Sequence, residues 1–132
     1  MNHDGALDLV LVEAGFLSVL LGDGRGALRV WQTESLGPRL GCDVQVRDLN
    51  GDWQPDLVLL GLYAPDVSLF LGDGTGGFGA ARSSLIGRRL SRAAGPSGRS
   101  LAVADVTGDG VPDVAVPVVE PDQIVVLPGT LR

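Results

Sequence analysis

Two nonapeptides in this chain carry oxygen-bearing side chains at a spacing that suits a metal ion. Residues 48–56 read DLNGDWQPD and residues 105–113 read DVTGDGVPD. In both, side-chain oxygens stand at positions 1, 3, 5 and 9, which is the layout that a hard cation requires from a short loop. A β-type apolar run follows each nonapeptide directly, LVLL in one and VAVPVV in the other. The sequence therefore predicts two acidic, metal-binding loops, each of which leads into a strand.

The chain opens with a third, shorter copy of the same motif. Residues 1–8, MNHDGALD, match positions 2–9, so position 1 is missing. We call residues 1–8, 48–56 and 105–113 loops one, two and three. The candidate ligands are the side-chain oxygens together with the main-chain carbonyl at position 7, which is Ala6, Gln54 or Val111. They are Asn2, Asp4, Ala6 and Asp8 in loop one; Asp48, Asn50, Asp52, Gln54 and Asp56 in loop two; and Asp105, Thr107, Asp109, Val111 and Asp113 in loop three. We expect loop one to be weak or empty unless a neighbouring chain supplies the missing ligand.

Calcium is the expected ion, because a dense set of protein oxygens suits it better than the smaller magnesium. Three carboxylates held within about 4 Å of one another repel at roughly 4 kcal/mol per pair when the effective dielectric is about 20, so loop three is expected to order poorly without a cation. Loop two carries Trp53 where loop three carries Gly110. If the turn requires positive φ there, the Trp costs about 1 kcal/mol, and loop two should bind more weakly.

Other interpretations of the acidic residues remain to be weighed. The simplest is that these residues only form Asx-turns between strands. An EF-hand or dockerin loop would need an acid at position 12, where the chain has Leu59 and Val116. Those two classes are therefore excluded, whereas the Asx-turn alternative stays open.

Composition limits the class of protein further. The 132 residues include thirteen Asp but three Glu, and ten Arg but no Lys, which favours loops over helices. The net charge of −6 argues against a nucleic-acid partner. A single Cys excludes an internal disulfide, and no apolar run is long enough to predict a membrane span. The chain also shows no signal peptide.

The strands expected around the acidic loops form a repeat. We expect strands near 7–12, 17–21, 27–31, 44–48, 57–60, 67–71, 78–82, 101–105, 114–119 and 123–127, from their alternation and from the Gly-Asp-Gly hairpin signals. With strands named A to D, the chain supplies B, C, D of one four-stranded meander, A to D of the next and A, B, C of a third. The predicted class is all-β, with about two and a half β-propeller blades. We expect residues 1–132 to form one domain, with repeats at 1–41, 42–98 and 99–132.

These motifs resemble the FG-GAP/VCBS repeat of integrin-α-type propellers and of many secreted bacterial proteins. The acidic loop with its strand and the later LGDGTGGFG carry the resemblance, which covers nearly the whole chain apart from linkers at 32–42 and 83–99. Phe78-Gly79 matches the FG element, but Gly61 with Ala64-Pro65 only loosely matches GAP, which favours the VCBS-like branch. The resemblance implies calcium bound between strands A and B at one rim, partners bound at the opposite rim, and an extracellular or cell-surface location.

The expected function is therefore that of a secreted, non-enzymatic, calcium-binding module for adhesion or recognition of a protein or glycan. Candidate ligand-binding residues are the basic and aromatic side chains of Arg88, Arg89, Arg92, Tyr63 and Trp31. Two alternatives are a self-assembling scaffold without a ligand and an accessory module of a polysaccharide-degrading enzyme. Because strands are missing at both ends of the array, we expect either a small homo-oligomer, with two or three chains in one ring, or a fragment of a longer propeller.

Overall fold

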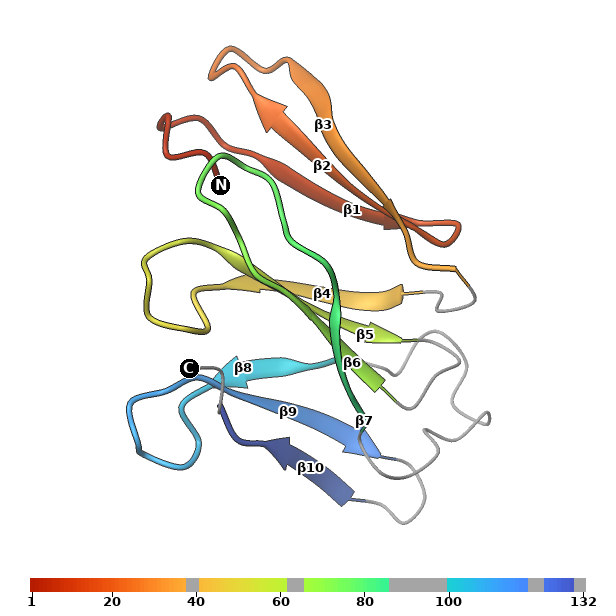
Figure 1. Ribbon diagram of the computed structural model, residues 1–132, viewed down its shortest axis with the longest axis vertical. Helices are drawn as coiled ribbons and strands as arrows, with labels where there is room; N and C mark the ends of the chain where they lie inside the picture. The colour runs from red at the N-terminus through yellow and green to blue at the C-terminus, as the bar shows by residue number, and fades with distance from the viewer. Residues whose placement is uncertain (38–40, 62–65, 86–99, 119–122, 130–132) are drawn as a thin grey trace.

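The computed structural model of the protein describes residues 1–37, 41–61, 66–85, 100–118 and 123–129. Within these ranges the chain forms ten strands and no helix, and all strand pairs are antiparallel. The strands make three sheets that follow one another along the long axis of the molecule (Figure 1). The predicted all-β class is confirmed, and the three sheets form an open array of partial propeller blades.

Each sheet is a meander in which strands adjacent in sequence are neighbours. The first sheet contains β1 (Leu9–Glu13), β2 (Phe16–Gly22) and β3 (Leu28–Ser35). The central sheet contains β4 (Gly41–Arg47), β5 (Asp56–Gly61), β6 (Asp66–Phe70) and β7 (Arg82–Leu85). The third sheet contains β8 (Ala102–Ala104), β9 (Asp113–Val118) and β10 (Gln123–Leu127). The predicted sequence of three, four and three strands is therefore confirmed.

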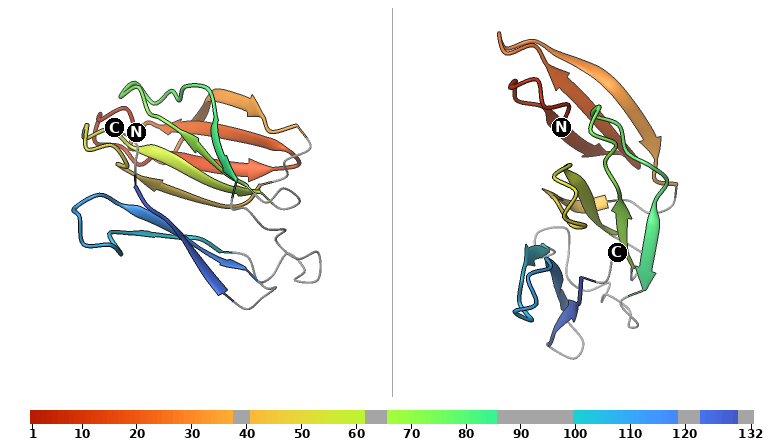
Figure 2. Two further views of the ribbon diagram at one scale, coloured as in Figure 1. Left: turned by 60° about the horizontal axis from the view of Figure 1, so that its bottom comes forward. Right: turned by 60° about the vertical axis from the view of Figure 1, so that its left-hand side comes forward.

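The core consists of two layers, one on each side of the central sheet. On β5, Leu57 and Leu59 pack against the first sheet, whereas Val58 and Leu60 pack against the third. Alternate side chains of a strand point to opposite faces, so a strand with neighbours on both sides must be apolar at every position. This explains why all of β5 is buried and why its residues 57–60, after the buried Asp56, are a continuous apolar run. The stacking of the three sheets is visible in Figure 2.

Polar side chains tie adjacent sheets together through main-chain groups. From β3, the Gln32 amide donates to the carbonyl of Phe78 at 3.1 Å and accepts the N–H of Phe78 at 2.9 Å. From β4, the Asp43 carboxylate accepts the N–H of Leu101 at 2.8 Å and the hydroxyl of Ser100 at 3.0 Å. The apolar layers are therefore supplemented by directional bonds that set how neighbouring sheets are placed.

Some predicted strand limits and both predicted linkers were wrong. The strand expected at 78–82 is β7 at Arg82–Leu85, and Phe78 takes part only in an isolated bridge with Gly72. The physical reason is a one-residue shift in register, as at a β-bulge: three residues separate Gly72 from Leu69, whereas four separate Phe78 from Arg82. The linker expected at 32–42 is partly strand, because β3 extends to Ser35 by pairing with β2 and β4 begins at Gly41. Residues 83–85 of the second linker likewise belong to β7.

The double burial of β5 predicts an unusual pattern of mutational sensitivity. Leu59→Ala and Leu60→Ala alter neighbouring residues that point into different layers, and each should reduce the free energy of unfolding by about 2–5 kcal/mol. Leu7→Ala, at a residue that is 90% exposed, should change it by less than about 0.5 kcal/mol. Denaturant unfolding of the three variants would measure this. A small loss for either buried residue would show that one of the layers is not packed as described.

Candidate metal-binding loops

The three acidic loops lie at the same edge of the array. Loop two connects β4 to β5, loop three connects β8 to β9, and loop one leads into β1, all on the left in Figure 1. The sheets are equivalent meanders, in which loops two and three are the A-to-B connections and loop one stands at the corresponding place before β1. The fold therefore presents the acidic segments, which are far apart in sequence, along one rim.

The loops share one backbone conformation. Positions 4 and 6 have positive φ, between 59° and 85°, in every copy: His3 and Gly5; Gly51 and Trp53; Gly108 and Gly110. Positive φ at position 6, the condition under which loop two was expected to be strained, is present even where the residue is Trp53, at 66°. Positive φ at position 4 was not anticipated, and it assigns His3 a place where the other loops have glycine. Left-handed conformation at a non-glycine residue costs about 1–2 kcal/mol, so two of the loops carry local strain.

Carboxylates at position 1 organise the turns. In loop two, Asp48 accepts the N–H of Gly51 at 2.7 Å and that of Trp53 at 2.9 Å. In loop three, Asp105 accepts the N–H of Gly108 at 2.6 Å and that of Gly110 at 2.9 Å. The two N–H groups thus converge on one carboxylate. Loop one lacks position 1 and therefore lacks this interaction.

Side chains at positions 3 and 5 extend the same network. Asp52 accepts the N–H of Gln54 at 2.8 Å, and Asp109 accepts that of Val111 at 2.9 Å. Asn50 accepts the N–H of Asp52 at 3.0 Å, and its amide nitrogen donates to the Asp52 carboxylate at 3.0 Å. These are Asx-turn interactions, so the simplest alternative interpretation describes how the side chains lie.

The aspartate at position 9 links the loop to a distant hairpin. One oxygen of Asp56 accepts the N–H of Leu49, at position 2, at 2.9 Å, and the other accepts the N–H of Gly72 at 2.8 Å. Asp113 likewise binds the N–H groups of Val106 and Gly129, each at 2.8 Å. We call this arrangement the carboxylate clamp, because a single buried side chain holds both ends of the loop and the start of the hairpin or its equivalent.

Loop one contains the same clamp with a different donor. Asp8 accepts the N–H of Gly22 at 3.0 Å, and its second oxygen lies 2.8 Å from the α-ammonium of Met1. Met1 stands at position 2, where Leu49 and Val106 use their main-chain N–H groups. The Asp8 side chain is 1% exposed, so this ion pair is shielded from water.

The clamp also explains why glycine stands at positions 22, 72 and 129. A Cβ added at Gly22, Gly72 or Gly129 would overlap the carbonyl oxygen at position 8 of the loop, which belongs to Leu7, Pro55 or Pro112. Gly22 and Gly72 open the Gly-Asp-Gly hairpins, yet only the later hairpin glycines, Gly24, Gly26, Gly74 and Gly76, have positive φ. The first glycine is therefore required by close approach. The signal in the sequence is that each position-9 aspartate is followed, 14 or 16 residues later, by a glycine: Gly22, Gly72 or Gly129.

Two clamp carboxylates differ in their electrostatics. Burial raises the pKa of Asp56, and the nearby carboxylates of Asp52 and Asp48 raise it further. In contrast, the N–H groups of Gly129 and Thr107 lower the pKa of Asp113 below its usual range. Loop two therefore concentrates negative charge around a buried carboxyl, which is an environment that a bound cation would relieve.

The donor set fits calcium by its chemistry, although the side chains do not converge on one point. Within the described residues, no group of three or more His, Cys, Asp or Glu side chains is placed to hold a metal ion. In the same part of the chain, the Oε1 atom of Gln54 is buried without a hydrogen-bond partner. The loops thus offer hard oxygen donors, although their carboxylates mainly accept main-chain N–H groups, and the unsatisfied Gln54 Oε1 atom is a side-chain oxygen outside the candidate ligand set.

Most residues predicted to bind a protein or glycan lie outside the described part of the chain. This applies to Tyr63, Arg88, Arg89 and Arg92. Trp31 is described, and it lies in β3 with its side chain 44% exposed. The Arg29 guanidinium stands 5.0 Å from the centre of its ring, a cation–π contact. One side of the indole is therefore already covered, and a ligand-binding role for Trp31 stays a prediction.

Repeated antiparallel meanders, with an acidic loop before β1, β5 and β9, define a β-propeller-type repeat module. The chain belongs to the FG-GAP-like repeat family, whose model matches residues 1–59 and 48–116. Proteins of this family are typically non-enzymatic. Searches of curated proteins and of solved structures find no match. In the described ranges, no helix is long and apolar enough to cross a membrane.

Strain at position 6 can be tested by exchanging residues between the loops. Trp53→Gly should stabilise the protein by about 0.5–1 kcal/mol, because relief of left-handed strain exceeds the added entropy of the unfolded chain. Little packing is lost, since Trp53 is 86% exposed. Gly110→Ala should destabilise by about 1 kcal/mol for the opposite reason. Thermal or denaturant unfolding would measure both, and a destabilised Trp53→Gly protein would contradict the assignment of strain.

Acid sensitivity should arise in part from the Gly-Asp-Gly hairpins. The N–H and hydroxyl of Thr75 lower the pKa of Asp73, whose carboxylate accepts both at 2.8 Å. A lowered pKa in the folded state adds stability above the unfolded value of about 3.9, and this contribution is lost as pH falls through the folded pKa. Thr75→Val should therefore raise the pKa of Asp73 and leave that of Asp23 unchanged. Titration of the carboxyl carbons by NMR provides the measurement, and an unmoved Asp73 would contradict it.

Proposed function

We propose that this chain is a non-enzymatic module that binds calcium through loops two and three and serves recognition of a protein or glycan. The family assignment supports a β-propeller-type repeat module as its coarse description. The proposal goes beyond that family description in three respects: metal binding, the ligand, and an extracellular or cell-surface location. Such repeats are commonly extracellular, where calcium is available at high concentration.

The observation that carries the calcium proposal is the shared conformation of loops two and three. Oxygen-bearing residues stand at positions 1, 3, 5 and 9 on a backbone with positive φ at positions 4 and 6. A carboxylate oxygen has two lone-pair directions, so accepting an N–H leaves capacity for an ion. In loop three the candidate ligands are Asp105, Thr107, Asp109, Asp113 and the carbonyl of Val111. In loop two they are Asp48, Asn50, Asp52, Asp56 and the carbonyl of Gln54.

The ion would neutralise repulsion that the protein now tolerates. Asp48 and Asp52 both raise the pKa of the buried Asp56, so the loop pays an electrostatic cost when all three are ionised. A divalent cation replaces this repulsion with attraction and holds the rim in one conformation. Calcium is thereby assigned a structural role, with the strands supplying a rigid base.

Calorimetry with paired variants tests the calcium proposal. We expect loop three to bind more tightly than loop two, because it has Gly110 instead of the strained Trp53. Asp109→Ala should then remove the tighter binding event and Asp52→Ala the weaker one. Calcium at 100 times its dissociation constant should stabilise the folded state by about 2.7 kcal/mol, and a chelator should reverse this.

A matched control for these variants is Asp23→Asn, at an exposed hairpin carboxylate outside the acidic loops. It should leave calcium binding unchanged. Equal losses from Asp109→Ala and Asp52→Ala would overturn the ranking of the loops. Absence of calcium heat, with a melting temperature indifferent to chelator, would favour Asx-turns as the whole function of these residues.

The recognition part of the proposal rests on the family and on the candidate residues Arg88, Arg89, Arg92, Tyr63 and Trp31. A glycan array together with a pull-down from extracellular protein tests it directly. A second candidate function, a self-assembling scaffold, is favoured by the apolar outward faces described next.

A further inference from the structure

The first sheet has an apolar face that no described part of the chain covers. This face is opposite to the one that packs on the central sheet, since β2 buries Leu17, Val19 and Leu21 and turns its other residues outward. Cross-strand pairing of Leu9 with Leu20 and of Leu20 with Val30 places residues of all three strands on it. The large apolar residues of this outward face are Leu9, Leu11, Phe16, Leu20, Leu28 and Val30.

Equivalent residues in the other sheets are buried against a preceding sheet. Leu9 and Leu11 are the first and third residues after Asp8, and each is 43% exposed. The matching residues after Asp56 and Asp113 are Leu57 and Leu59, and Val114 and Val116, and they are at most 7% exposed. These four pack on the sheet that precedes them in the chain. The outward face of the first sheet is thus one half of an interface that the chain builds twice within itself.

The other half of that interface is exposed on the third sheet. Ile124 lies five residues before Gly129, as Val67 lies before Gly72 and Leu17 before Gly22. Leu17 and Val67 are 3% and 1% exposed because each packs against a following sheet, whereas Ile124 is 72% exposed. Val126 and its cross-strand partner Ala115 share the face of Ile124, while Val125 and Leu127 pack toward the central sheet.

We propose that the outward face of the first sheet binds the outward face of the third sheet of a second copy of this chain. The occupant is a second copy because one chain carries both halves of the interface, and both halves match pairs of faces that already pack together inside it. The contact is heterologous, so it links copies head to tail and closes a ring or continues as a filament according to the rotation per copy.

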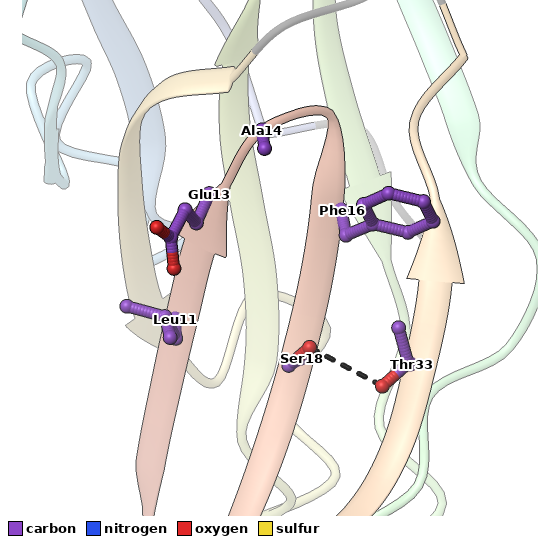
Figure 3. A pocket seen from close by; sticks show the side chains of 6 residues that line it. All are labelled: Leu11, Glu13, Ala14, Phe16, Ser18 and Thr33. Atoms are coloured by element: carbon purple, nitrogen blue, oxygen red, sulfur yellow. Dashed lines mark hydrogen bonds between the residues drawn. The ribbon is translucent and has the colours of Figure 1, made fainter.

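A hollow on the first sheet marks where this contact is deepest. It has a volume of about 400 Å³ and is lined by Leu11, Glu13, Ala14, Phe16, Ser18 and Thr33 (Figure 3). The hydroxyls of Ser18 and Thr33 lie 3.2 Å apart and bond to each other, so one of the two O–H donors is satisfied within the hollow. Leu11 and Phe16 provide the apolar part of the lining, which an incoming apolar side chain would contact.

Ile124 is the side chain that suits the hollow. The hollow lies beside the β1–β2 turn, and Ile124 lies near the corresponding end of β10, next to its cross-strand partner Pro117. In the central sheet, Leu60 corresponds to Pro117 and Val67 corresponds to Ile124. Leu60 and Val67 both pack in the layer between the central and third sheets. Insertion of Ile124 beside Leu11 and Phe16 would repeat that packing between copies.

Sedimentation velocity of the full 132-residue chain tests the proposal. The unmutated protein should self-associate at micromolar concentration, and Leu11→Arg or Ile124→Arg should each weaken association by at least about thirtyfold, as expected of a charge at the centre of an apolar contact. The matched control is Trp53→Arg, which alters an 86% exposed apolar residue in loop two of the central sheet, away from both outward faces, and should leave association unchanged. Circular dichroism would verify that every variant keeps its β-sheet.

Mixing the two interface variants distinguishes head-to-tail contact from other modes. Leu11→Arg protein retains the face around Ile124, and Ile124→Arg protein retains the face around Leu11, so an equal mixture should form a one-to-one dimer and nothing larger. A folded, monomeric unmutated chain would overturn the proposal. A mixture that stays monomeric would also overturn it. So would Leu11→Arg protein that still forms the same assembly as the unmutated chain. Sedimentation is run with calcium and with chelator, so a failure of metal binding is recorded separately.

Discussion

A buried carboxylate at the end of each acidic loop is the interaction on which this structure depends. Asp56 and Asp113 each accept main-chain N–H groups from the start of the loop and from a glycine sixteen residues further along the chain. Because charged hydrogen bonds are stronger than neutral ones, a single side chain replaces the bonds that the irregular loop cannot make with a sheet. It also connects the A-to-B loop with the end of strand C. The rim and the blade therefore form one unit.

Packing between units follows from the same repetition. The clamp sets the position from which each strand alternates, so residues one and three after the aspartate face one neighbour and residues two and four face the other. The central sheet meets neighbours on both sides and is the most deeply buried part of the core. The end sheets use the same alternation with only one neighbour, which leaves Leu9, Leu11 and Ile124 exposed. Interaction between copies is thus a continuation of the internal packing.

The backbone of loops two and three is ordered by hydrogen bonds within each loop. Asx-turns hold the acidic residues of loops two and three on a backbone with two left-handed positions, so little conformational entropy would be lost on binding an ion. The loops differ in strain and in the pKa of their clamp residues, although their sequences follow one pattern. Different affinities within one rim are therefore expected from local physical chemistry alone.

The number of strands and their grouping were determined by the sequence itself, because alternation and turn chemistry are local properties. Other features required the tertiary structure. Leu9 and Leu57 stand at the same place in the repeat, yet only Leu57 is buried, since burial depends on a neighbouring sheet. Gln32 binds both main-chain groups of Phe78, although the two residues lie 46 positions apart. The first glycine of each hairpin is explained by a carbonyl at position 8 of the loop. Contacts between distant segments decided these features, and no local pattern records them.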